Sequence, residues 1–67
     1  MTSAECYRVI SALHESYLLA ETDYKIALED YGENHTITTI RKMIFDNDRE
    51  AYEIMLSFQK EVFPDDT

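Results

Sequence analysis

The side chains that could carry out chemistry in this 67-residue chain are one cysteine, two histidines and fourteen carboxylates. A thiol nucleophile needs a base close by and a third group that orients the base. Cys6 precedes His14 by eight residues, and no separate acidic residue is in register to orient the pair. The pattern places His14 in mid-helix and His35 in a turn, so together they predict no metal site. We interpret Cys6 as a buried, unreactive thiol at a helix interface.

The acidic run from Asp46 to Glu50 is similar to the opening of a calcium-binding loop. Two required residues are missing, because Ala51 stands where the loop needs glycine and Ser57 where it needs a bidentate glutamate. The remaining carboxylates would need an enclosed pocket to act in general acid–base catalysis, and two helices do not form one. We therefore expect no enzyme, and no catalytic, cofactor-binding or metal-binding residue.

The charge balance limits the partners that this chain can bind. Six basic and fourteen acidic side chains give a net charge of −8. Nucleic-acid phosphates and anionic lipids repel such a protein, so we expect no direct nucleic-acid or membrane binding and favour a protein partner with a basic surface. No apolar run approaches the length of a membrane span, and the N-terminal residues lack the pattern of a signal peptide. These features are typical of a soluble, cytoplasmic protein.

The first half of the chain has the periodicity of one long helix, spanning about residues 3–31. Thr2 and Glu5 form a capping box that would begin the helix, and Gly32 is placed to end it. Apolar or semi-apolar residues recur at alternating intervals of four and three, which predicts a seam for a partner helix. Besides Cys6 and Ala27, this seam comprises Ile10, Leu13, Tyr17, Ala20, Tyr24 and Tyr31.

A second helix is predicted over about residues 37–63, after a turn at 32–36. Its N-cap could be Asn34, Thr36 or Thr38, and Pro64 disfavours helical geometry at the preceding residue, leaving an acidic tail at 64–67. The apolar spacing again alternates between three and four residues. The predicted seam of this helix comprises Ile37, Ile40, Ile44, Asn47, Ala51, Ile54 and Phe58.

The two seams match when the chain is folded back on itself. In that register Tyr24 faces Ile44, and Tyr17 faces the small Ala51, so that large and small residues alternate. Asn47 is the one polar residue in mid-seam, where a buried amide fixes register or association state. The expected fold is all-α: a single-domain, two-helix antiparallel hairpin that dimerises into a four-helix bundle.

Apolar residues remain after the seams are assigned, and they form two further stripes, which we expect on opposite sides of the hairpin. The stripe on the first helix contains Ala12, Leu19 and Ile26. The surface on the second helix contains Phe45, Tyr52, Met55, Leu56, Val62 and Phe63, with Leu18 and Tyr7 nearby. Leaving so much apolar area in water would exceed the stability margin of a small domain, so we predict a homodimer through the second surface. The first stripe would then bind another partner, or the two roles are reversed. Alternatively, the helices of a small bundle are simply apolar on two sides.

The overall plan resembles the small acidic helical accessory proteins of temperate bacteriophages, including those of the lambdoid early region. The resemblance is carried by the Thr2–Glu5 cap, the two seams, Gly32 and Pro64, and it includes no diagnostic motif. It implies a regulator that binds a host or phage factor, acting in the host cytoplasm.

Taken together, the sequence predicts a non-enzymatic interaction or regulatory module that binds its partner through an acidic and apolar helical surface. The alternative is an acidic inhibitor that imitates DNA phosphates and occupies the basic cleft of a DNA-binding protein. A further explanation of the charge is solubility alone.

Overall fold

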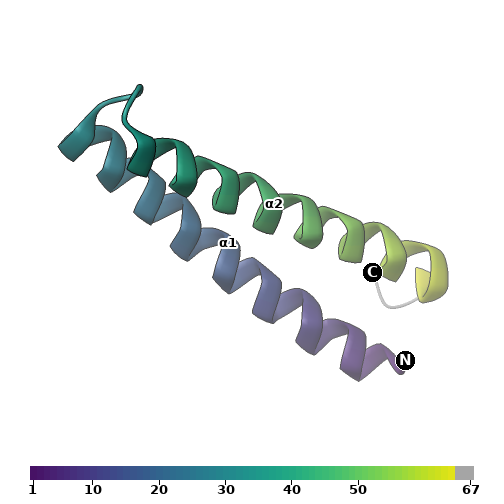
Figure 1. The fold of residues 1–67 in the computed structure, drawn as a ribbon. Helices are drawn as coiled ribbons and strands as arrows, with labels where there is room; N and C mark the ends of the chain where they lie inside the picture. Colours follow the sequence, from purple (N-terminus) through teal and green to yellow (C-terminus); the bar gives the residue numbers. More distant parts are fainter. Residues whose placement is uncertain (65–67) are drawn as a thin grey trace.

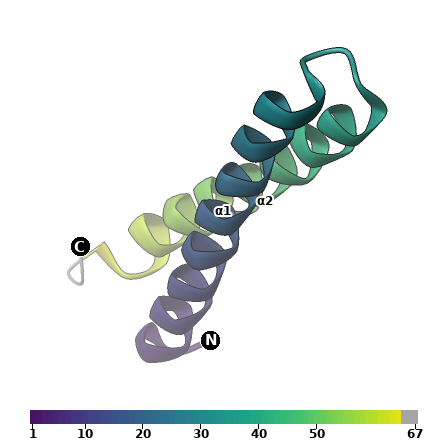
Figure 2. The same cartoon turned by 90° about the vertical axis from the view of Figure 1, so that its left-hand side faces the viewer.

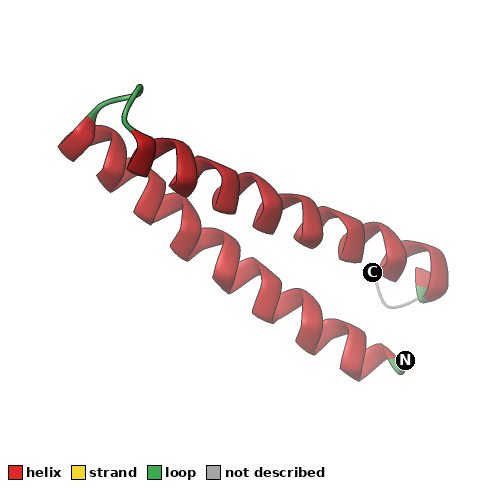
Figure 3. Ribbon diagram, in the orientation of Figure 1, coloured by secondary structure: helices red, strands yellow, loops and turns green. Residues whose placement is uncertain are grey.

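The computed structural model describes residues 1–64 and consists there of two long helices joined by a short turn (Figures 1 and 3). Helix α1 spans Ser3–Tyr31 and helix α2 spans Thr36–Val62. They pack side by side in antiparallel directions, and the two ribbons cross in the view of Figure 2. The chain's only glycine and proline lie outside both helices, so neither helix is interrupted. The predicted all-α hairpin is thus confirmed, as a rod of 45 × 16 × 15 Å.

Thr2 caps the start of α1. Its hydroxyl oxygen accepts a hydrogen bond from the Glu5 N–H at 3.1 Å, as the capping box predicts. The Glu5 carboxylate accepts a hydrogen bond from the same hydroxyl at 3.0 Å, whereas a complete capping box would direct it to the Thr2 amide. Thr2 therefore satisfies a free amide of the first helical turn by itself.

Gly32 ends α1 and starts the turn. Its φ is 85° and its ψ is 168°, a conformation that glycine adopts far more readily than any residue with a Cβ. The Gly32 N–H donates to the Leu28 carbonyl oxygen at 3.1 Å, which satisfies one of the last carbonyls of the helix. The expected helix stop is present, but its ψ is extended rather than left-handed helical.

Helix α2 is capped by His35, which was not among the predicted caps. The His35 Nδ1 accepts a hydrogen bond from the Ile37 N–H at 3.1 Å, so an imidazole nitrogen here does what an Asn or Asp oxygen usually does. The imidazole ring also packs on Tyr31, with ring centroids 4.7 Å apart, which holds it in place. The predicted caps, none of which is the N-cap, were Asn34, Thr36 and Thr38.

The far end of α2 lies one residue before the predicted end. Val62 is the last helical residue, and the Phe63 N–H donates to the Gln59 carbonyl oxygen at 2.8 Å. Phe63 has φ −130° and ψ 61°, outside the helical region, as expected for the residue before Pro64. Of the predicted acidic tail, residues 65–67 lie outside the described part of the chain.

The side of α1 that packs against α2 follows the predicted seam. Cys6, Ile10, Ala20 and Ala27 are buried, and the side chains of Leu13, Tyr17 and Tyr24 are half-buried. Tyr31 departs from the prediction, because it is 50% exposed and packs on His35 beyond the end of the helix pair.

The side of α2 that faces α1 differs from the predicted seam by one residue. The observed positions, each one residue after a predicted one, are Thr38, Phe45, Asp48, Tyr52, Met55 and Gln59, of which Thr38 is buried and the rest are half-buried. One residue corresponds to a rotation of about 100° around the helix axis. The prediction was therefore wrong for Ile37, Ile40, Ile44, Asn47 and Ile54, which are exposed, whereas Ala51 and Phe58 at the edge are half-buried.

Aromatic packing and one buried hydroxyl explain this rotation. The Phe45 ring lies 5.5 Å from the Tyr17 ring and 5.9 Å from the Tyr24 ring, between centroids. Thr38 is 2% exposed, and its hydroxyl donates to the Ala27 carbonyl oxygen at 3.2 Å. An aromatic ring buries more area than an isoleucine, and small Ala27 leaves space for the buried threonine beside it. The isoleucines are consequently turned away from α1.

Candidate interaction surface

The residues that could do chemistry are held apart by the hairpin. Cys6 is fully buried, and it lies eight residues from His14 on α1, about 12 Å along the axis. The His14 ring packs on the Tyr52 ring, with centroids 5.0 Å apart. His35 caps α2 at the turn. The structure therefore brings no nucleophile and base together among these three residues.

Within residues 1–64, no group of three or more His, Cys, Asp or Glu side chains is arranged to hold a metal ion. The run from Asp46 to Glu50, which is similar to a calcium-loop opening, is helical throughout. Its Asp46 carboxylate instead pairs with Arg49 at 3.8 Å, one turn further along α2, and the guanidinium lies 5.6 Å from the centre of the Phe45 ring. This run is a solvated helical face beside the aromatic residues.

An open groove of about 390 Å³ lies on α2. Three carboxylates, from Glu50, Glu53 and Glu61, surround the apolar side chains of Ile54 and Phe58. Every lining residue belongs to one helix, so the groove has no opposite wall that could hold a small molecule in a fixed orientation. An acidic rim around apolar side chains is better suited to contact another protein.

The predicted seam of α2 forms a largely exposed stripe, here called the outer α2 stripe. Its isoleucines Ile40, Ile44 and Ile54 are 50%, 45% and 60% exposed. The stripe keeps the alternating spacing that lets one helix insert side chains between those of another. Its members are Ile37, Ile40, Ile44, Asn47, Ala51, Ile54 and Phe58.

The first-helix stripe of Ala12, Leu19 and Ile26, here called the α1 stripe, lies on the same side of the hairpin. Leu19 is 64% exposed and Ile26 is 50% exposed. Near the turn, Ile26 and Ile37 line one shallow hollow of about 270 Å³, beside the interhelical ion pair between Arg41 and Asp23 at 3.7 Å. The surface expected on the opposite side, that of Phe45 and Tyr52, is instead turned toward α1, and the same rotation brings the isoleucines of α2 to the side where the α1 stripe lies.

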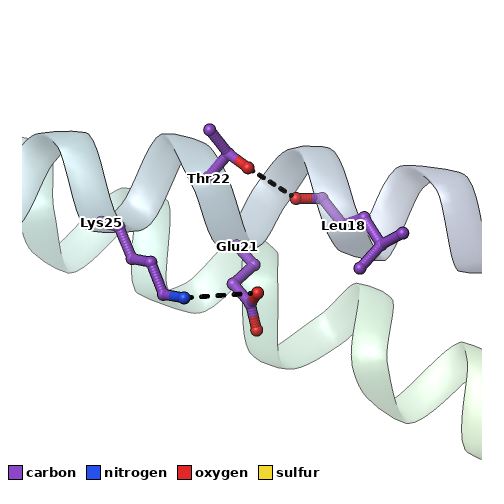
Figure 4. A network of polar contacts seen from close by, with 4 residues as sticks. All are labelled: Leu18, Glu21, Thr22 and Lys25. Atoms are coloured by element: carbon purple, nitrogen blue, oxygen red, sulfur yellow. Dashed lines mark hydrogen bonds and ion pairs between the residues drawn. The ribbon is translucent and has the colours of Figure 1, made fainter.

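On the other side of α1, polar side chains pair with groups of the same helix. Figure 4 shows the Lys25 ammonium paired with the Glu21 carboxylate at 3.5 Å, and the Thr22 hydroxyl donating to the Leu18 carbonyl oxygen at 3.1 Å. Leu18 precedes Leu19 by one residue, so its side chain points about 100° away from the α1 stripe. Leu18 is 45% exposed there among polar neighbours.

Most of the surface predicted for dimerisation lies inside the hairpin instead. Phe45, Tyr52, Met55, Leu56 and Phe63 are half-buried, and the first two pack on the rings of α1. Aromatic side chains were assigned to the outside because the seam was placed one residue too early. The predicted interface residues that are exposed are Leu18, Leu19, Ile26 and Val62, together with Tyr7 and Ala12.

Charge is distributed unevenly along α2. Arg41 and Lys42 lie near its start, where residues 36–44 contain no acidic side chain. Most of the helix's carboxylates, including Glu50 and Glu53, lie in its second half. The helix therefore has a basic first part and a predominantly acidic second part.

No helix within residues 1–64 is sufficiently long and apolar to cross a membrane. Comparison with known protein families, curated proteins and solved structures gives no match for this chain.

Proposed function

We propose that this chain is a non-enzymatic protein-interaction module whose binding surface is the face formed by the outer α2 stripe and the α1 stripe. The observation that supports the proposal is the set of isoleucine and leucine side chains on one side of the rod that are 37–64% exposed. Scattered exposed apolar residues are ordinary, whereas a contiguous stripe on two helices is typical of a surface that another protein covers.

Covering the isoleucines of this face and Leu19 is energetically favourable. Burying a fully exposed side chain of this kind stabilises by about 1.5–3 kcal/mol, and these six side chains are on average about half exposed, so covering them adds roughly 5–9 kcal/mol in total, comparable with the stability of a small domain. A chain of this length has a small core of its own. Covering the exposed face therefore stabilises the hairpin as well as forming the complex.

The proposed assembly is a homodimer in the form of a four-helix bundle, which then presents its acidic outer surface to a protein with a basic patch. A regulatory role of this kind agrees with the resemblance to small acidic phage accessory proteins.

The test is sedimentation equilibrium combined with capture of partners on the immobilised chain. We expect an assembly heavier than the 7.9 kDa chain, and binding of partners that is lost when Ile40 and Ile44 are replaced by aspartate. A monomer that captures no protein at physiological salt would contradict the proposal.

The alternative role, imitation of DNA, is supported by the net charge of −8 on a narrow rod. It predicts that binding weakens steeply as ionic strength rises and that DNA competes for the same partner. Apolar docking predicts weak dependence on salt and no competition by DNA, so one salt series separates the two roles.

A further inference from the structure

The two exposed stripes share a common centre along the hairpin. Leu19 is the middle residue of the α1 stripe, and Asn47 is the middle residue of the outer α2 stripe. The rings of His14 and Tyr52 contact each other, and Leu19 and Asn47 each lie five residues from that pair in the direction of the turn. Equal steps along two packed helices place Leu19 and Asn47 at about the same level.

We propose that a second copy of this chain covers the face, related to the first by a two-fold axis that crosses the helices at the level of Leu19 and Asn47. Such an axis packs α1 on α1 and α2 on α2 of the second copy, in antiparallel directions. Every helix in the resulting four-helix bundle is antiparallel to both of its neighbours. The inference rests on the proposed function and specifies the symmetry axis and the register of its homodimer.

The outer α2 stripe is complementary to itself about this axis. Ile40 and Ile54 each lie seven residues from Asn47, so each contacts the other in the opposite copy. Ile44 and Ala51 lie three and four residues from Asn47, which places a large side chain against a small one. A stripe that reads alike in both directions is what an isologous interface requires.

The α1 stripe obeys the same symmetry. Leu19 meets its own copy, and Ala12 and Ile26, each seven residues from Leu19, again place a small residue opposite a large one. Because the α1 stripe and the outer α2 stripe are centred at one level, a single axis satisfies both helices at once. A chance partner would not require the two centres to coincide.

Asn47 explains how the register is fixed. Its carboxamide has both donor and acceptor groups, so two copies near a two-fold axis satisfy each other. Displacing the helices by one turn would leave each amide against isoleucine without a hydrogen-bonding partner, which is unfavourable.

Charge favours the antiparallel orientation. It brings Arg41 of one copy to the level of Glu53 of the other, because each lies six residues from Asn47, Arg41 beside Ile37 and Glu53 beside Ile54. A parallel arrangement would place cations beside cations and carboxylates beside carboxylates, which repel.

The broad side of the rod is similar in size to one partner's share of a standard interface. The broad side of the rod, 45 by 16 Å, has a projected area of about 700 Å², close to the roughly 800 Å² per partner of a standard interface.

The first experiment compares Leu19→Asp with Leu18→Asp by sedimentation equilibrium. The two variants introduce the same charge on adjacent residues of one helix, but only Leu19 lies in the proposed interface. We expect Leu19→Asp to raise the dimer dissociation constant by about 100-fold or more, because the substitution occurs twice in the interface, and Leu18→Asp to change it less than about 5-fold. Equal effects of the two substitutions, or a wild-type monomer at micromolar concentration, would overturn the proposal.

The second experiment tests the orientation by oxidative cross-linking. Cys6 is fully buried, so an introduced cysteine is the reactive thiol. Asn47→Cys should cross-link to its own copy, and Ile54→Cys alone should not, whereas a mixture of Ile40→Cys and Ile54→Cys should give the mixed product. Efficient self-linking of Ile54→Cys would show a parallel pair and overturn the proposed axis.

The two proposals fail separately. A monomeric wild-type chain that still captures a partner, with capture lost in Leu19→Asp, would remove the two-fold dimer and keep the interaction module. If the chain gives the predicted cross-links but captures no partner, the two-fold dimer is supported and the proposed binding of another protein is contradicted.

Discussion

Thr38 is the most deeply buried residue of α2 in the described part of the chain. It is 2% exposed, and its hydroxyl is bonded to the Ala27 carbonyl oxygen on the other helix. The isoleucines on either side of it are exposed, so this small β-branched residue, and not its larger neighbours, fits the space beside the small Ala27. Size therefore decides which residue enters the interface here.

Substitution of Thr38 tests that packing. Thr38→Val keeps the shape of the side chain and removes the hydroxyl that donates to Ala27. The Ala27 carbonyl oxygen is a main-chain acceptor of helix α1, so we expect a loss of about 1 kcal/mol or less in unfolding free energy. Thr38→Leu adds volume where there is none and should cost about 1–3 kcal/mol. Urea unfolding followed by circular dichroism, at one fixed protein concentration, measures both. Equal stability of the valine and leucine variants would contradict close packing at this position.

Gly32 is the position in the turn where backbone conformation alone matters. A Cβ built there would meet no atom within 4 Å, so an alanine would fit without a clash, but its φ of 85° is strained for any residue other than glycine. We expect Gly32→Ala to lower the unfolding free energy by about 1–3 kcal/mol without changing the helix content. Thermal unfolding measures this, and a stabilised variant would show that the turn relaxes to another conformation.

Helix α2 has two adjacent apolar stripes, and only one of them can pack against α1. The stripe that packs against α1 is the aromatic one, in which Phe45 and Tyr52 interleave with Tyr17 and Tyr24. The isoleucine stripe, about 100° away, is then left for another molecule, an angle close to the right angle between neighbours in a four-helix bundle.

Adjacent alanine substitutions test the orientation of α2. Phe45 packs between two tyrosine rings, so Phe45→Ala should lower the stability of the hairpin by about 2–3 kcal/mol, less than for a fully buried phenylalanine. Ile44 is 45% exposed, so Ile44→Ala should leave the isolated hairpin nearly unchanged and weaken only the assembly. Unfolding of each variant in the monomeric Leu19→Asp background measures the hairpin alone. A larger loss of stability in Ile44→Ala than in Phe45→Ala would contradict the observed orientation of α2 and favour the isoleucine seam.

The whole molecule is too thin to bury both sides of its helices. In the described part of the chain only four apolar residues are buried, in a rod 15 to 16 Å across. Many large apolar side chains remain in contact with water. A structure of this shape acquires further stability by covering its exposed face, which links folding to association.

Coupled association predicts that thermal stability depends on protein concentration. Because a dimer that dissociates on unfolding is favoured by mass action, the unfolding midpoint of the wild-type chain should rise with concentration. Leu19→Asp should abolish the dependence, and Leu18→Asp should preserve it. Scanning calorimetry over a range of concentrations provides the measurement, and a constant midpoint for the wild-type chain would contradict coupling.

The two helices, both ends of α1 and the hairpin could be predicted because they depend on local features, whereas the N-cap of α2 could not. Helix α1 begins at Thr2 and stops at Gly32 through hydrogen bonds and backbone angles that involve neighbouring residues. The α1 side of the interface was also predictable, since Cys6, Ile10 and Ala20 form one clear stripe. The His35 cap was missed because histidine is an uncommon cap, and only its contact with Tyr31 holds the ring in position.

Which stripe of α2 faces α1 was decided only by the tertiary structure. The sequence by itself determined that α2 has heptad-spaced residues, but the isoleucine pattern and the pattern one residue later both satisfy that spacing. Periodicity measures where apolar residues recur around one helix, whereas the choice between two such stripes depends on the shapes that meet across the interface. Rings that fit against Tyr17 and Tyr24, and a hydroxyl that reaches the Ala27 carbonyl, exist only once both helices are in place, and they turned the isoleucines outward.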